Sequence, residues 1–149
     1  MRTCLVLGIG ALLGAATLSG AQALQRINPP GLSAPTTYSH VVRAGKTVYI
    51  AGQVGADAQG KVVGPGMKEQ VEQVMSNLRT ALASQGLDYG HVAKINIYVL
   101  SIDEFRAADV AAIRAKHFGS NRPASTLVQV DRLADPAYRV EIEAIAVAP

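Results

Sequence analysis

One amphipathic segment, enclosed by helix breakers, sets the main constraint on the fold. Between residues 67 and 85, apolar side chains recur at the three- and four-residue spacing of one helix face. Pro65 and Gly66 precede the segment, and Gly86 stands where a C-terminal cap belongs. The sequence therefore predicts a helix over 67–85 with one apolar face, formed by Val71, Val74, Met75, Leu78 and Leu82.

The segments before this helix have the composition of short strands. Residues 38–43 and 47–51 are rich in β-branched and aromatic side chains, and Ala44-Gly45-Lys46 between them is typical of a hairpin. Gly52 then interrupts the second run, which indicates a bulge or a close backbone approach. Residues 61–63 are expected to form a further short strand.

The second half of the chain repeats this mixture of strands and helix. Residues 93–100 alternate between apolar and polar side chains, as in a half-buried strand. The capping box Ser101-Ile-Asp-Glu104 predicts a second helix that ends near residue 118. Residues 126–130 and 139–147 are expected as the last two strands.

The predicted order is β-β-β-α-β-α-β-β. Strands and helices mix without strict βαβ alternation, which favours an α+β fold over a doubly wound one. We expect both helices to pack on one face of a mixed sheet.

The N-terminus has the pattern of a signal peptide. Arg2 precedes an apolar run over residues 5–18, and Ala21-Gln22-Ala23 fits a signal-peptidase site. We expect residues 1–23 to be cleaved and the protein to be exported, periplasmic or secreted, with no membrane contact afterwards. A retained anchor is the alternative, but a span needs about 20 apolar residues and this run is shorter.

Cleavage would leave one domain without a cysteine. Residues 24–37 carry several prolines and are expected to form an extended N-terminal arm, with residues 38–149 as a single domain. Cys4, the only cysteine, would be lost, so a disulfide or a cysteine nucleophile is excluded from the mature chain.

The charge pattern argues against a nucleic-acid partner. The formal net charge is +3, from 14 basic and 11 acidic residues, and the loss of Arg2 lowers it to +2. The basic residues are scattered along the chain, whereas phosphate binding needs a basic patch. The three histidines have no metal-ligand spacing, so neither a metal nor another cofactor is expected.

Over residues 38–148 the chain resembles the Rid (RidA/YjgF) family. The similar motifs are Tyr38-Ser-His-x-Val, Ala51-Gly-Gln53, Asn77 to Leu82, Ile95-Asn-x-Tyr-Val99 and the tail from Arg122-Pro-Ala to Val147. The resemblance implies a chorismate-mutase-like α+β subunit, a homotrimer, and ligand clefts between neighbouring subunits. It also implies a small-molecule substrate, an enamine or imine, which the deaminating members hydrolyse.

The same resemblance implies the residues of the cleft. Tyr38, the backbone of Ala51 and Gly52, and Asp109 would line it, and Glu141 would position the catalytic water.

One position departs from the deaminating branch of the family. Ser125 stands where that branch has an arginine that binds the substrate carboxylate, and Leu127 stands where cysteine is frequent. A guanidinium offers a permanent charge and two parallel donors, whereas a hydroxyl offers one neutral donor. A charged hydrogen bond is worth roughly 1.5–3 kcal/mol, so the loss would weaken carboxylate binding about 10 to 100-fold or more.

Two other arginines are candidates to replace the missing one. Arg122 lies at an odd offset from Ser125 and should point to the opposite face of the strand. Arg139 shares a face with Glu141, but such a pair is more often a plain ion pair. Glu143, two residues after Glu141, forms an acid/base couple with it in one interpretation and pairs with a cation in the other.

Two functions remain open at this point. The first is a hydrolase of a small enamine, imine or related substrate, with its specificity altered by Ser125. The alternative is a non-catalytic trimer that binds small molecules or acts as a chaperone. The standard deamination of 2-iminobutanoate is the least expected activity, because the arginine is missing.

Overall fold

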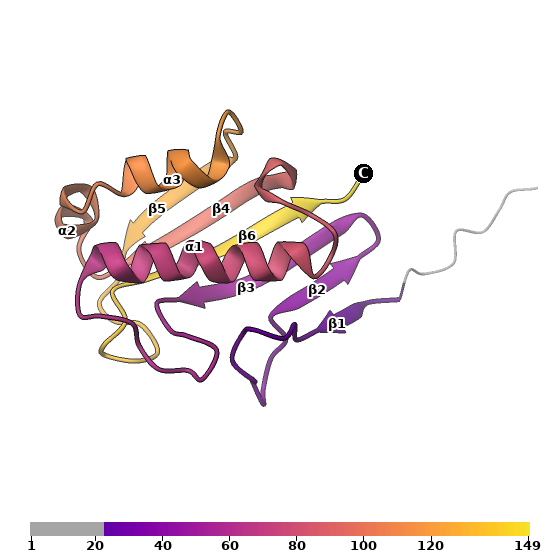
Figure 1. The fold of residues 1–149 in the computed structure, drawn as a ribbon, viewed down its shortest axis with the longest axis horizontal. Coiled ribbons are helices and arrows are strands. Elements are labelled where there is room, and N and C mark those ends of the chain that lie inside the picture. Colours follow the sequence, from indigo (N-terminus) through magenta and orange to yellow (C-terminus); the bar gives the residue numbers. More distant parts are fainter. Residues whose placement is uncertain (1–22) are drawn as a thin grey trace, which may run out of the picture.

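The computed structural model describes residues 23–149, and its core is one six-stranded sheet with all three α-helices on one face (Figure 1). The proposed signal peptide lies outside the described residues, apart from Ala23. The elements are β1 (Gln25–Ile27), β2 (Val41–Ala44), β3 (Thr47–Val54), α1 (Met67–Ala83), the short 3₁₀ helix η1 (Tyr89–His91), β4 (Val92–Val99), α2 (Ile102–Ala107), α3 (Val110–Phe118), β5 (Ala124–Gln129) and β6 (Val140–Val147).

The strand order is β1-β2-β3-β6-β4-β5. Only β4 and β5 are parallel, and the other neighbours are antiparallel. The mixed sheet with helices on one face confirms the predicted α+β class. None of the helices in residues 23–149 is long and apolar enough to cross a membrane.

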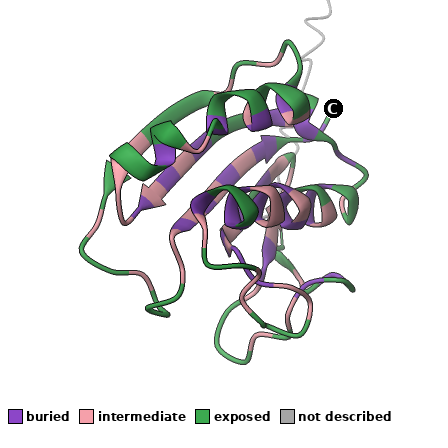
Figure 2. Cartoon of the chain, turned by 60° about the vertical axis from the view of Figure 1, so that its left-hand side comes forward, coloured by how far each residue is buried: buried purple, intermediate pink, exposed green. Residues whose placement is uncertain are grey.

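The core lies between α1 and the central strands, where buried residues recur along the ribbons in Figure 2. The five apolar residues predicted for the inner face of α1 are all at most 1 % exposed. They meet side chains that alternate along β6 and β4, including Ile142 and Ile97. A bulge shifts the β3–β6 register between Ile50 and Gln53, as expected from Gly52.

The strands before α1 are partly misplaced in the prediction. Residues 61–63 form no strand, and Val62 makes only an isolated bridge to Ala56. Asp57 explains this, because its carboxylate accepts hydrogen bonds from the backbone of Gln59 and Lys61 and closes a tight turn. Instead, residues 25–27 of the predicted arm form β1 and pair with β2.

The predicted second helix is divided in two. Asp109, between α2 and α3, has a left-handed backbone with φ 55°, which a continuous helix excludes. Ser101 does cap α2, since the Glu104 backbone N–H donates to its hydroxyl at 3.1 Å. The Glu104 carboxylate pairs with Arg139 at 3.8 Å and does not bond to the Ser101 backbone N–H, so only half of the predicted capping box forms.

Gln70 on α1 fixes the loop that leads into β6. Its side chain is fully buried, donates to the Ala137 carbonyl at 2.8 Å and accepts from the Arg139 backbone N–H at 2.8 Å. One amide therefore satisfies two polar groups of a loop that has no regular structure of its own. This contact ties α1 to the segment that enters β6.

We expect Gln70→Met to lower the free energy of unfolding by about 1–3 kcal/mol, because it leaves two part-buried backbone groups without their side-chain partner. Urea denaturation measures the change, and Gln59→Met in an exposed loop is the matched control. Equal stability of the two variants would contradict the assigned role of Gln70.

Candidate functional site

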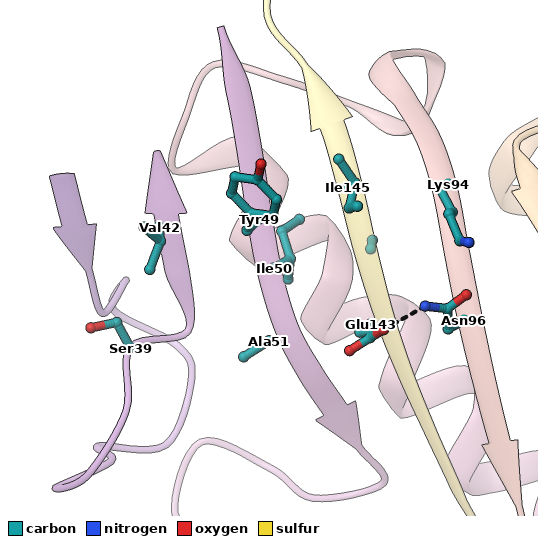
Figure 3. A pocket seen from close by; sticks show the side chains of 10 residues that line it. Ser39, Val42, Tyr49, Ile50, Ala51, Lys94, Asn96, Glu143 and Ile145 are labelled. Atoms are coloured by element: carbon teal, nitrogen blue, oxygen red, sulfur yellow. Dashed lines mark hydrogen bonds between the residues drawn. The ribbon is translucent and has the colours of Figure 1, made fainter. Parts of the chain in front are cut away.

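The face of the sheet opposite the helices carries most of the polar side chains of the central strands. Figure 3 looks onto this open face, where Glu143 of β6 lies beside Asn96 of β4, and Tyr49 of β3 lies farther along the strands, level with Ile145. They line a hollow of about 280 Å³ together with Ala51 and Lys94. Strand alternation puts Glu141 and Glu143 on this same face, as predicted.

Glu143 is already occupied by hydrogen bonds. Asn96 donates to its carboxylate at 2.5 Å, and the Tyr98 hydroxyl donates to the same oxygen at 3.2 Å. Glu143 is therefore held in place by the neighbouring strand, which suits a positioning role better than proton transfer.

Glu141 has a different environment. Within residues 23–149, no hydrogen bond or ion pair engages its half-buried carboxylate. Burial raises the pKa of Glu141 above its ordinary value, and the charge of Glu143 adds to this effect. Glu141 also lines a second, open hollow of about 540 Å³ with Tyr98, Arg132 and Leu133. An unpaired carboxylate with a raised pKa beside a hollow can accept a proton from a bound water.

Gly52 allows the carboxylate to occupy this position. A Cβ atom at residue 52 would overlap the Glu141 side chain, with Oε1 as the nearest atom. The bulge in β3 and the absence of a side chain thus bring the backbone of residues 51–52 against Glu141. The structure places these predicted residues together.

Tyr38 and Glu141 both lie near Tyr138. Burial raises the pKa of Tyr138, and the nearby groups Asp135, Tyr38 and Glu141 raise it further. The Tyr38 side chain is 51 % exposed, and its ring meets His40 edge-on at 5.4 Å. His40 itself is buried and bonded to the Ser33 carbonyl and Gln53, which is a structural role.

Ser125 and Leu127 are not on the open face. They pair in register with Ile95 and Ile97, whose side chains point into the core beneath the helices. Ser125 and Glu141 therefore lie on opposite faces of one sheet. Asp109 is exposed at the α2–α3 junction, and within residues 23–149 it forms no hydrogen bond or ion pair with Glu141.

A residue that the sequence patterns did not indicate lies beside Ser125. Arg114 of α3 directs its guanidinium at the Ser125 hydroxyl, with Nη2 donating to Oγ at 3.4 Å. Spacing along one strand cannot find such a contact, because it joins a helix and a strand. The two arginines considered as replacements are engaged elsewhere: Arg122 donates to the Gly119 carbonyl, and Arg139 pairs with Glu104.

Residues 23–149 contain no group of three or more histidine, cysteine, aspartate or glutamate side chains suited to hold a metal ion.

Comparisons with known proteins agree on one family. The family model described as "Endoribonuclease L-PSP" matches residues 30–148. The human 2-iminobutanoate/2-iminopropanoate deaminase is 35 % identical over 119 residues, which cover 79 % of this chain and 83 % of the human protein. A Yersinia pestis protein of the conserved Rid family has a solved structure with a TM-score of 0.78, 28 % identity, and coverage of 85 % of this chain and 100 % of its own.

A third relative is a Mycobacterium tuberculosis member of the YjgF/YER057c/UK114 family. Its structure superimposes with a TM-score of 0.69 at 28 % identity, and the match covers 85 % of this chain and 100 % of that one. These similarities confirm the fold class expected from the resemblance.

We expect Gly52→Ala to destabilise the protein by about 1–3 kcal/mol, because the new methyl group forces Glu141 or the bulge to move. In the double variant Gly52→Ala/Glu141→Ala the obstructing side chain is gone, so much of the loss should be recovered. Urea denaturation of the four species gives the coupling. Purely additive effects would show that the two residues do not meet.

The raised pKa of Glu141 predicts a pH-dependent stability difference. The protonated form of Glu141 stabilises the folded protein. This contribution is fully present below the pKa of Glu141 in the unfolded chain and is lost as pH rises through its pKa in the folded protein. Glu141→Gln lacks this titration, so the variant's stability minus that of the wild type should grow as pH rises. Denaturation between pH 4 and pH 8, about the range over which a shifted glutamate titrates, measures it. A difference that does not change with pH would disprove the shift.

Proposed function

The chain belongs to the YjgF/Rid family, and from this membership we propose that it hydrolyses a small imine or enamine in a cleft between subunits. Curated relatives named 2-iminobutanoate/2-iminopropanoate deaminase support deaminase-type chemistry. The human and goat proteins with this name are 35 % and 38 % identical to the chain over the matched residues.

The environment of Glu141 is the observation that carries the proposal. A half-buried carboxylate with a raised pKa and no partner among residues 23–149 is free to bind a water. Glu141 takes a proton from this water as the oxygen attacks the imine carbon. The proton then passes to the nitrogen, which gives a carbinolamine. The hydroxyl proton of this intermediate moves to the nitrogen as the carbon–nitrogen bond breaks, so that a carbonyl compound and ammonia leave.

The opposite placement of Ser125 and Glu141 supports a cleft made by two copies. Since one sheet separates these residues within a chain, a ligand can contact both only when one subunit supplies Ser125 and its neighbour supplies Glu141. Tyr49, Val128 and Val147 are large exposed apolar side chains on the strands, and burial of such side chains favours association. We propose a homotrimer, with a small-molecule substrate and no nucleic acid.

The name of the matching family model does not make this chain a nuclease. The chain has only three more basic than acidic residues, and its basic residues are scattered along the sequence, so it would make few contacts with phosphates. Ser125 favours a second candidate, a non-catalytic small-molecule binder, because the strand lacks the arginine of the deaminating branch. Catalytic turnover distinguishes the two candidates. Export after removal of residues 1–23 remains part of the proposal.

The proposal predicts that Glu141→Gln lowers the rate of imine hydrolysis by about 100-fold or more, which is the usual contribution of a general base. The assay follows 2-iminobutanoate, generated in situ by an amino-acid oxidase, with residues 24–149. Glu104→Gln, which removes an exposed carboxylate on α2, is the matched control and should keep its activity.

Light scattering should show the same assembly for both variants, and thermal melting should show both folded at the assay temperature, before rates are compared. Wild-type protein that forms a trimer but hydrolyses no imine would favour the binding protein. Equal rates for wild type and Glu141→Gln would remove Glu141 from the mechanism.

A further inference from the structure

Arg114 is a partly buried cation without a counter-ion. Its Nε atom is buried and has no hydrogen-bond partner, and its Nη2 reaches only the neutral hydroxyl of Ser125. Among the residues described, 23–149, no carboxylate lies within ion-pair distance of it. Burial lowers the pKa of Arg114, but a guanidinium stays charged in proteins.

Such a charge is expensive to keep unless something pairs with it. Removing a guanidinium from water without a partner costs free energy, which is why buried charges in proteins are paired or bind ligands. The guanidinium of Arg114 is only partly buried, with its Nε unpartnered, and an anion bound from outside the chain would pair with its charge.

A hollow of about 290 Å³ lies beside the guanidinium. Arg114, Arg122 and Asn121 line it with Ala111, Ala115, Phe118 and Pro123, so two cationic side chains and one amide meet a largely apolar wall. Arg122 also donates to the Gly119 and Asn121 carbonyls, which leaves Arg114 as the less engaged cation. The hollow is just below the usual range of pockets for drug-sized ligands, about 300–1,000 Å³. The ligand class that fits is a small molecule with one carboxylate and a short hydrocarbon part.

Ser125 does not line this hollow, but its hydroxyl contacts Arg114, which does. Because the Ser125 oxygen accepts from Arg114, its own hydroxyl proton is free to point away and donate to a ligand. The strand supplies a neutral donor, and the helix behind it supplies the charge. A carboxylate at this position would be bound by both, and a charge-assisted hydrogen bond is the stronger kind.

We propose that Arg114 is the carboxylate-binding residue of this protein and that its ligands are small aliphatic carboxylates. This inference rests on the proposed function, in which the carboxylate belongs to the imine substrate. In this interpretation the positive charge is not lost. It is supplied by α3 instead of by position 125 of β5, and this change of position alters the specificity.

The direct test is calorimetric binding of 2-oxobutanoate and of its neutral amide to residues 24–149. Wild type should bind the acid about 10-fold or more tightly than the amide, since only the acid can form charged hydrogen bonds. Arg114→Gln should remove this preference. Arg114→Lys should keep part of it, because lysine retains the charge but not the fork.

Two further variants separate ligand binding from general damage. Arg106→Gln removes an exposed arginine of α2 and should leave the preference unchanged. Arg114→Gln/Ser125→Arg moves the guanidinium from the helix to the strand, and it should restore acid binding. A preference that persists in Arg114→Gln, or a wild type that binds acid and amide equally, would overturn the inference.

Kinetics distinguish this inference from the proposed function. With an imino-acid substrate, Arg114→Gln should raise KM about 10 to 100-fold, whereas Glu141→Gln should lower kcat and leave acid binding intact. If Arg114→Gln hydrolyses the imine with an unchanged KM, the carboxylate site at Arg114 is disproved and the proposed hydrolase activity is not. If acid binding depends on Arg114 but the protein shows no turnover, the hydrolase activity is disproved and the carboxylate site is not.

Discussion

The division of the sheet into a covered and an open face governs the rest of the structure. Side chains alternate along β6, so Ile142 and Ala144 pack under α1 while Glu141 and Glu143 lie on the other side. A slip of one residue would exchange the two sets and bury both carboxylates. The hydrophobic pattern that makes β6 a central strand is thus the same pattern that presents Glu141 to a ligand.

Elements with strong periodicity could be predicted from sequence, and those fixed by single contacts could not. Several residues each repeat the apolar pattern of α1, β4 and β6, so one residue that departs from the pattern does not prevent the prediction. β1 has only three residues and exists because β2 offers an edge to pair with. The division between α2 and α3 depends on one left-handed residue, Asp109, which no helical periodicity reveals.

The same distinction holds for the candidate site. Gly52 and Glu141 could be proposed from a glycine inside a strand pattern and from the resemblance, and the structure shows why they belong together. Arg114 could not, because its contact with Ser125 depends on how α3 packs over β5. In the sequence, serine at position 125 looks like the loss of a charge. In the structure, the guanidinium of Arg114 contacts the Ser125 hydroxyl.

The position of β6 has a consequence for the time at which the sheet can form. Its eight residues are the last strand in the sequence, yet they lie between β3 and β4, which form no pair with each other. During synthesis β3 and β4 must therefore wait with unpaired edges until β6 emerges, and such long-range pairing is slow. A chain cut before residue 140 would lose the centre of its sheet, not an edge.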